Sequence, residues 1–214
     1  MRLTVIWTLF LSLYREAVMA AYVIGDIKIT DPDTYAKYAA RVPATSEPYG
    51  VRYLVRGPDK CEIVEGDWLP ERLVLAEYES LETIKAWYYS PEYSELIKLR
   101  QSASTANMIF VEGEKSGINM AAYLIGDIEI TDQDSYEKYR AGVPATVAAY
   151  GGKFLVRGAQ CEVIEGAWTP HRLEVLGFES MEKVKAWYNS AEYSDLKKIR
   201  QSASKGNLIF AEGA

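Results

Sequence analysis

The hexapeptide Tyr22-Val-Ile-Gly-Asp-Ile27 recurs as Tyr123-Leu-Ile-Gly-Asp-Ile128, at an offset of 101 residues (123 − 22). Later in the chain, Arg100-Gln-Ser-Ala-Ser104 recurs as Arg200-Gln-Ser-Ala-Ser204, where the offset has fallen to 100 after the loss of one loop residue. Several more segments between these two pairs agree in the same order. Self-similarity at a fixed period marks a duplicated structural unit. The sequence therefore predicts that one domain occurs twice in this chain.

The duplication divides the chain into two domains and a connector. Met19 begins the tetrapeptide Met-Ala-Ala-Tyr, and Met120 begins the same tetrapeptide. We therefore expect the first repeat at 19–113 and the second at 120–214. The segment 114–119 between them is polar and contains a glycine, which is typical of a linker.

Residues 1–18 lie outside both repeats. Their apolar run, 3–13, is too short to cross a bilayer. It fits the core of a secretory signal with Val18-Met19-Ala20 as the cleavage site, or an upstream extension of the reading frame. The charged pair Arg15-Glu16 directly before that site favours an extension. We therefore expect a cytoplasmic protein, with secretion as the alternative.

Composition and charge exclude several classes of function. The chain is 49% hydrophobic and 25% charged, as an ordinary folded domain is, so we do not expect disorder. Its net charge is −6 without a cluster of basic residues, so neither nucleic acid nor membrane is an expected partner. The single histidine, His171, has Glu71 as its counterpart and cannot build a multi-histidine metal centre. With no nucleotide or zinc motif, no cofactor is expected.

Each repeat alternates strand-forming segments with helix-start signals. Asp31-Pro32 offers a capping Asp followed by Pro at the first helical position. Pro43 is expected to kink or restart this helix, and Gly50 to end it. Ser80 and Ser90 begin two further helices. The expected strands of the first repeat are 21–30, 52–57 and 61–65 (one interrupted strand or two short ones), 72–78 and 107–112.

The resulting order, β-α-β-β-α(α)-β, is the ferredoxin-like split βαβ pattern of an α+β fold. This pattern places the helices on one face of an antiparallel sheet and leaves the other face uncovered. An uncovered apolar face must be buried against another layer. The second repeat supplies a matching sheet, so we expect the halves to pack sheet to sheet as an intrachain pseudo-dimeric α+β barrel. Further homo-oligomers are left open.

The repeats also resemble a known family. The segments AAYVIGDIKITDPDTYAKY (20–38), EGDWLPERLVLAEYES (65–80) and AWYYSPEYSELIKLRQSA (86–103) resemble the domain-of-unknown-function family numbered 1330. The resemblance extends over nearly all of both repeats and implies the dimeric α+β barrel superfamily. By this resemblance, the relatives of the chain in that superfamily include cofactor-free oxygenases, haem-degrading enzymes and plain binding proteins. A shared fold does not assign a reaction.

Arg100 and Arg200 are the most informative charged residues. Tyr93 and Arg100 are spaced to share one helix face, which its apolar members mark as the inward face. A buried guanidinium must be paired or must bind an anion. One alternative is therefore a salt bridge to a core carboxylate such as Asp26 or Asp127. The other is an anchor for a carboxylate or enolate ligand.

Other side chains also have two interpretations each. Arginines at strand ends beside glycines can line the rim of a cavity or extend into solvent. Aromatic side chains on the second helix can shape a ligand pocket or fill the core. The arginines are Arg56 and Arg157, with Arg72 and Arg172 treated alike, and the aromatic residues are Trp87, Trp187, Tyr88 and Tyr188.

Two more duplicated pairs complete the candidates. Asp26 and Asp127 lie within otherwise apolar strands and could act as general bases, unless they pair with the buried arginines. Cys61 and Cys161 are one duplicated position, so we expect small buried side chains rather than a disulfide.

Two functional hypotheses remain open. In the first, each repeat binds a small aromatic or carboxylated metabolite, with or without cofactor-free catalysis of an oxygenase, isomerase or cyclase type. In the second, the protein is a non-catalytic binding or assembly module. Because Val74 becomes Glu174 and Glu77 becomes Gly177, the two copies of a site need not be equivalent.

Overall fold

The computed structural model describes residues 19–58 and 60–214, so the predictions for residues 1–18 lie outside the described residues. Both repeats have the predicted order of elements. The first comprises β1 (Met19–Ile29), α2 (Pro32–Ser46), η1 (Glu47–Tyr49), β2 (Arg52–Pro58), β3 (Cys61–Glu65), β4 (Arg72–Tyr78), α3 (Leu81–Tyr88), α4 (Pro91–Ala103) and β5 (Ser104–Glu114). The second comprises β6 (Ala122–Ile130), α5 (Gln133–Ala149), β7 (Lys153–Arg157), β8 (Cys161–Glu165), β9 (Leu173–Phe178), α6 (Met181–Tyr188), α7 (Ala191–Ala203) and β10 (Ser204–Glu212).

The predicted caps begin the helices. The Asp31 side chain accepts hydrogen bonds from the first-turn backbone of α2, and Ser80 and Ser90 do the same for α3 and α4. Unlike the expected restart, α2 continues through Pro43 to its end. Gly50 follows the short η1 turn with a φ of 69°, a left-handed conformation that glycine adopts without steric cost. Among the described residues, no helix is both long and apolar enough to cross a membrane.

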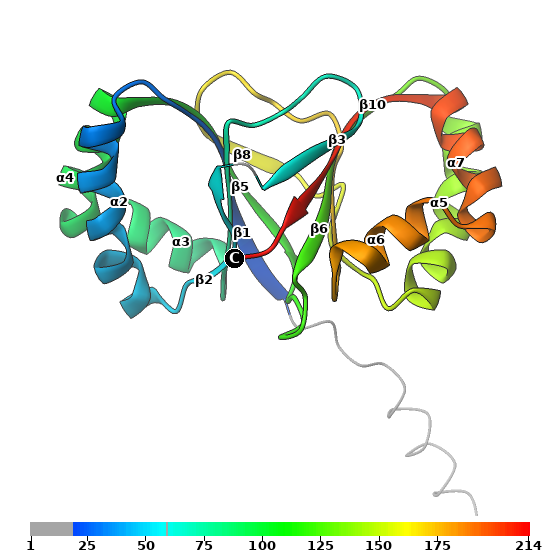
Figure 1. The fold of residues 1–214 in the computed structure, drawn as a ribbon, viewed down its shortest axis with the longest axis horizontal. Helices are drawn as coiled ribbons and strands as arrows, with labels where there is room; N and C mark the ends of the chain where they lie inside the picture. The colour runs from blue at the N-terminus through cyan, green and yellow to red at the C-terminus, as the bar shows by residue number, and fades with distance from the viewer. Residues whose placement is uncertain (1–18, 59) are drawn as a thin grey trace, which may run out of the picture.

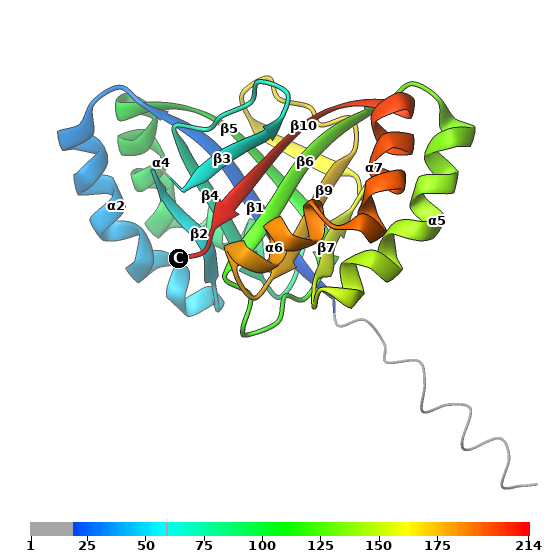
Figure 2. The ribbon, with the colours of Figure 1, turned by 45° about the vertical axis from the view of Figure 1, so that its right-hand side comes forward.

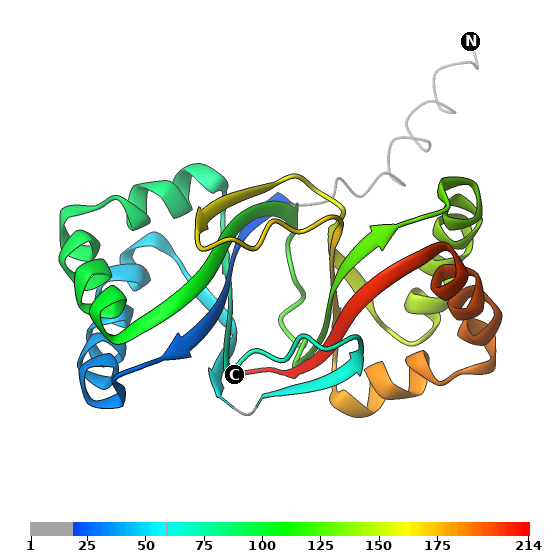
Figure 3. The ribbon, with the colours of Figure 1, turned by 90° about the horizontal axis from the view of Figure 1, so that it is seen from above.

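Two five-stranded antiparallel sheets form the centre of the molecule. Their strand orders are β2-β4-β1-β5-β8 and β3-β10-β6-β9-β7. The third strand of each repeat therefore leaves its own sheet: β3 pairs with β10 of the second repeat, and β8 pairs with β5 of the first. Figure 3 shows this reciprocal exchange, with β3 beside β10 and β8 beside β5. Each sheet is completed by the other repeat.

The sheets pack face to face, as the sequence predicted. One buried apolar cluster contains inward-facing residues of both repeats, including Tyr22, Ile24, Tyr123 and Ile125. The helices cover the outer faces, α2 to α4 on one flank and α5 to α7 on the other (Figure 1). The turned view shows both sheets running between these helical layers (Figure 2). Burial of the uncovered sheet faces against each other holds the two repeats together.

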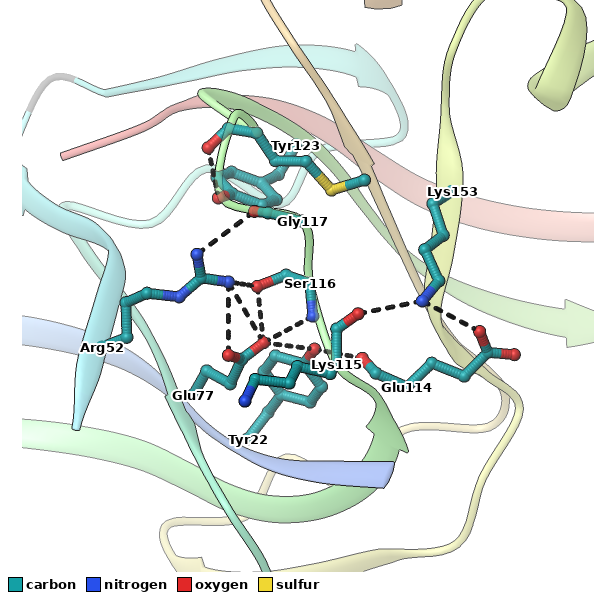
Figure 4. Close-up of polar contacts among 10 residues, drawn as sticks. Tyr22, Arg52, Glu77, Glu114, Lys115, Ser116, Gly117, Tyr123 and Lys153 are labelled. Carbon is teal, nitrogen blue, oxygen red and sulfur yellow. Dashed lines mark hydrogen bonds and ion pairs between the residues drawn. The ribbon is translucent and has the colours of Figure 1, made fainter. Parts of the chain in front are cut away.

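The connector between the repeats is fixed to the first repeat rather than loose. Glu77 on β4 is 5% exposed and accepts hydrogen bonds from the Tyr22 hydroxyl (3.0 Å) and the Ser116 backbone N–H (2.6 Å). Arg52 forms an ion pair with Glu77 (3.2 Å) and donates to the Gly117 carbonyl (3.2 Å). Figure 4 shows these contacts converging on Glu77. The second repeat has Gly177 at this position.

Candidate ligand-binding site

A cavity lies between α2 and the helix-facing side of the first sheet. Its volume is about 40 Å³, within a concavity of about 510 Å³ counted out to solvent. A buried water needs roughly 10–15 Å³, so the inner part has room for a few waters. The enclosed volume is well below the roughly 300–1,000 Å³ of usual ligand pockets, so a larger molecule would occupy the open part of the concavity as well. The lining residues are Val23, Ile27, Tyr35, Tyr38, Ala39, Val42, Tyr53, Arg56, Arg72, Val74, Ala76, Tyr78, Trp87, Tyr93 and Met108.

Two arginines from neighbouring strands form the charged part of this lining. Arg56 lies on β2 and Arg72 on β4. Arg56 donates one hydrogen bond to the Ala39 carbonyl (3.2 Å) and lies over the Tyr53 ring at 4.4 Å. Arg72 lies 5.5 Å from the Tyr35 ring centroid, and its buried Nε has no hydrogen-bond partner. Among the residues that the structure describes, no carboxylate lines this cavity, so both cations face neutral walls.

Phenol groups supply the remaining polar atoms of the cavity. The hydroxyls of Tyr38 and Tyr93 lie 3.0 Å apart, and the buried hydroxyl of Tyr78 has no partner. Burial raises the pKa of Tyr78 and Tyr93 above the usual value of 10.0. Burial also raises the pKa of Tyr35, although Arg72 opposes this shift. These phenols are therefore neutral at physiological pH and can donate hydrogen bonds to a ligand.

The buried arginine Arg100 pairs with the opposite repeat. It is fully buried on α4, and its Nη1 lies 2.7 Å from Oε2 of Glu165 on the exchanged strand β8. The residue thus forms the ion pair that one alternative expected, with Glu165 as the partner instead of Asp26 or Asp127. Its Nε and Nη2 have no hydrogen-bond partner, and Tyr38 and Tyr93 separate it from the cavity, of whose lining it is not part. Its predicted role in holding a ligand has no direct contact to support it.

Arg200 is paired more completely than Arg100. Its Nη1 and Nη2 both donate to the carboxylate of Glu65 on the exchanged strand β3, at 2.9 and 2.5 Å, and its Nε donates to Tyr193 (3.2 Å). Gln201 also donates to Glu65 (2.9 Å). Asp127 is not its partner. Bidentate pairing of this carboxylate with a buried guanidinium stabilises the contact between the repeats.

The predicted aromatic residues separate into two groups. Trp87 lines the cavity and donates from Nε1 to the Thr45 hydroxyl (3.2 Å). Tyr88 packs against Phe110 and is absent from the lining. In the second repeat, Trp187 repeats the bond of Trp87 to a threonine, and Tyr188 donates to Glu65. Trp87 is thus the member of this set that the structure brings to the cavity.

The aspartates lie elsewhere. Side chains alternate along a strand, so Ile27 of β1 faces the cavity while Asp26 faces the other sheet. Asp26 accepts a hydrogen bond from Trp68 Nε1 (3.0 Å), and Asp127 accepts the equivalent bond from Trp168 (3.0 Å). The two indole rings meet between the repeats at 5.2 Å. Proton transfer by these aspartates stays a prediction, at a place separate from the cavity.

The remaining singled-out residues have simple environments. Cys61 and Cys161 are free and partly buried against the core between the sheets, where burial raises the pKa of each thiol to about 11. The exposed ring of His171 lies 3.6 Å from a carboxylate oxygen of Asp127. Within residues 19–58 and 60–214, no group of three or more His, Cys, Asp or Glu could hold a metal ion.

The second repeat has a carboxylate where the first has an apolar side chain. Glu174 takes the position of Val74 and pairs with Arg172, with Oε1 to Nε at 2.7 Å. Its side chain is 9% exposed. Burial raises the pKa of Glu174 to about 7, while Arg172, Arg157 and Arg140 oppose this shift. The arginine pair that faces neutral walls in the first repeat therefore faces an internal anion in the second.

Much of this cavity was not predicted from the sequence. Tyr35 and Tyr38 are visible in the sequence as a buried helix face, which is equally typical of a core. The change from Val74 to Glu174 is visible as well, but its meaning depends on the strand register. That register places Val74 opposite Arg56 and Glu174 opposite Arg157. Directly opposed residues share one face of a sheet, so these side chains are neighbours.

The sequence model of the family "domain of unknown function (DUF1330)" matches residues 20–114 and 121–214. The chain belongs to this family. It has two copies of the domain in tandem, which together form the complete barrel. The family's name assigns no activity. No curated protein matches this chain in sequence.

Solved structures with the same fold have distant sequences. A proposed monooxygenase of Lactobacillus acidophilus is 14% identical with a TM-score of 0.52, over 91% of this chain and 94% of that one. A proposed monooxygenase of Fusobacterium nucleatum is 7% identical with a TM-score of 0.55, over 92% and 93%. An anthrone oxidase-like protein is 10% identical with a TM-score of 0.50, over 93% and 92%. At these identities the likeness shows the shared dimeric α+β barrel fold alone.

Proposed function

We propose that the first repeat binds a small organic molecule with an aromatic or apolar body in the cavity beneath α2. The observation that carries this proposal is the pair Arg56 and Arg72, which faces apolar and phenolic walls with no carboxylate among the described lining residues. Pockets for small molecules combine such apolar walls with a few fixed polar groups. A buried cationic donor without a partner is costly, and a ligand acceptor would satisfy it.

The lining supports binding rather than proton transfer. Its polar side chains are guanidinium groups and phenols, and burial moves the pKa of Tyr78 and Tyr93 further from neutrality. A general base works best with a pKa near the operating pH. Cofactor-free catalysis of an oxygenase, isomerase or cyclase type therefore remains a prediction from sequence and is not part of this proposal.

The assembly-module hypothesis describes a different part of the molecule. Arg100 with Glu165 and Arg200 with Glu65 join the repeats. All three guanidinium nitrogens of Arg200 have partners, whereas Arg100 is paired through Nη1 alone. Arg72 has no such partner in the described chain. Assembly accounts for the buried arginines of α4 and α7, whereas ligand binding accounts for the arginine at the cavity.

The test fills the cavity with the side chains of the second repeat. Ala76 lines the cavity, and its counterpart is Leu176, so Ala76→Leu adds bulk that this fold already accommodates. The binding of phenol, phenylacetamide and phenylacetate is followed through the indole N–H NMR signal of Trp87. We expect that signal to shift in the wild type, and at least one probe to bind about tenfold more weakly to Ala76→Leu. A tenfold loss corresponds to about 1.4 kcal/mol.

Two controls keep the result interpretable. Leu176→Ala changes the same position in the other repeat and should leave the Trp87 response unchanged. Val23→Leu, which copies Leu124, fills the cavity from β1 if Ala76→Leu does not fold. An unshifted Trp87 signal with all three probes at millimolar concentration would overturn the proposal, as would undiminished binding to both filled variants.

A further inference from the structure

The two repeats hold the same arginine pair at equivalent sequence positions, although Arg72 begins β4 and Arg172 directly precedes β9. Arg56 lies directly across from Val74 in the pairing of β2 with β4, and Arg72 lies two residues before Val74 on the same face. In the second repeat, Arg157 lies across from Glu174, and Arg172 precedes it by two residues. The difference between the two arrangements is thus confined to what stands between the arginines.

In the second repeat this place is taken by a carboxylate on a short apolar arm. The Glu174 carboxylate contacts Arg172 at 2.7 Å and is nearly inaccessible to solvent. In the first repeat Val74 offers Arg72 no carboxylate. The buried Nε atoms of Arg72 and Arg172 both lack a hydrogen-bond partner, so the repeats differ in the ion-pair contact. A guanidinium prefers a planar oxyanion that it can bind through a fork of N–H groups. The first repeat therefore keeps both arginines and lacks the carboxyl group that accompanies them in the second.

Neighbouring substitutions follow the same division. The second repeat replaces small side chains of the first with larger ones: Val23 by Leu124, Ala39 by Arg140 and Ala76 by Leu176. It also replaces the phenols Tyr53 and Tyr78 by Phe154 and Phe178. The first repeat, which lacks the internal carboxylate, therefore has both the smaller side chains and the additional phenol donors.

We infer that Glu174 occupies, in the second repeat, the place that a ligand's carboxylate takes between Arg56 and Arg72 in the first. This inference rests on the proposed function and deepens it, because it gives the ligand class: a monocarboxylate on an aromatic or apolar body. Residue 74 or 174 then decides which repeat is open. The neutral hydroxyl of Tyr78, which lacks a protein partner, is a further donor within the same cavity.

The first arm of the test is made in the second repeat and does not depend on any ligand of the first. Glu174→Ala removes a CH₂–COO⁻ group, which is acetate less one hydrogen. Acetate should therefore fill the vacated place and raise the Tm of this variant by about 3 °C at roughly ten times its Kd. Acetamide, and chloride at equal ionic strength, should not, and acetate should raise the Tm of the variant more than that of the wild type. Equal effects of acetate and acetamide on the variant would overturn the inference.

The second arm compares two matched probes in the first repeat. Phenylacetate should bind wild-type protein at least tenfold more tightly than phenylacetamide, by calorimetry and by the Trp87 signal. Val74→Glu should weaken phenylacetate binding at least tenfold more than the isosteric but uncharged Val74→Gln. If both probes bind equally well, the carboxylate inference fails while the proposed function stands. If neither probe shifts Trp87, the proposed function fails, whatever acetate does to Glu174→Ala.

Discussion

The two repeats solve the same electrostatic problem differently. Each aligns two arginines on neighbouring strands beneath its first helix, and each must keep those cations from being buried without a partner. The second repeat supplies Glu174, whereas the first leaves an open concavity beside Val74. The comparison teaches that fold and arginine positions are shared, and that one side chain decides whether an internal carboxyl group contacts the second arginine of the pair.

The same comparison holds at the connector. Glu77 of the first repeat accepts hydrogen bonds from Tyr22, Arg52 and Ser116, while Gly177 of the second lies against the flexible side chain of Met120. A Cβ at Gly177 would lie 2.3 Å from the Met120 sulfur. Here the asymmetry follows from connectivity, because a connector leaves the first repeat and enters the second.

We expect the largest loss of stability when the ion pairs of the exchanged strands are removed. Glu65→Ala leaves the buried Arg200 without its carboxylate, and Glu165→Ala does the same to Arg100. Removing one partner of a buried ion pair costs about 3–5 kcal/mol. Because Glu65 accepts more hydrogen bonds than Glu165, its loss should lie at the upper end. Urea denaturation measures the loss of unfolding free energy in both variants. The control is Glu62→Ala, on the same strand as Glu65, which removes an exposed ion pair with Lys185 and should cost about 1 kcal/mol or less.

A pH titration sharpens the contrast between Glu174 and Val74. Burial raises the pKa of Glu174 from 4.5 to about 7, so the folded protein takes up a proton more readily than the unfolded chain. Stability from this group is fully present below about pH 4.5 and is lost as the pH rises through about 7. The difference amounts to about 3 kcal/mol. Glu174→Gln should flatten the unfolding free energy between pH 5 and 8; parallel curves would contradict the assignment.

Glu77→Ala tests the connector. Four donors on Tyr22, Arg52 and Ser116, two of them on Ser116, lose their acceptor, which should cost about 2 kcal/mol. The freed connector should also be cleaved faster by trypsin after Lys115. Glu79→Ala, at an exposed position just after β4, should change neither the unfolding free energy nor the cleavage rate. Unchanged cleavage in Glu77→Ala would show that other contacts hold the connector.

We expect the smallest loss of stability from Tyr53 and Ser46, two hydrogen-bonded residues that are both replaced in the second repeat. Tyr53 and Ser46 share a hydrogen bond of 3.0 Å in the first repeat, and Phe154 and Val147 replace both in the second. Tyr53→Phe should cost about 1 kcal/mol because it leaves the buried Ser46 hydroxyl with fewer partners. Adding Ser46→Val should recover part of this loss. A double-mutant cycle measures the coupling, and strictly additive costs would contradict it.

Local patterns predicted most of the fold. Caps at Asp31, Ser80 and Ser90, and the uncovered sheet face, led to the pseudo-dimeric barrel that the structure shows. The exchange of β3 and β8 was not predicted, because a short strand such as Cys61–Glu65 fits the edge of either sheet equally well. Edge pairing is decided by contacts across the whole molecule, which no local pattern contains.

The site was predicted less completely, for two physical reasons. Strand alternation already places Asp26 with Tyr22 on the face opposite the helices, so the sequence did contain the signal against an Arg100–Asp26 pair. In contrast, Glu165 is the partner of Arg100 because of the strand exchange. The arginines at the cavity needed strand register before Glu174 could be recognised as their internal acceptor.

The short covalent bridge between the halves, Glu114–Asn119, permits something that a pair of identical subunits cannot achieve. In a homodimer, both subunits have the same sequence, so a substitution that fills one site also fills the other. Joining the halves in a single polypeptide releases them from that rule, and Val74 can coexist with Glu174 inside one barrel. The second repeat can then keep its own carboxyl group at the site, while the first repeat leaves that position open to a ligand.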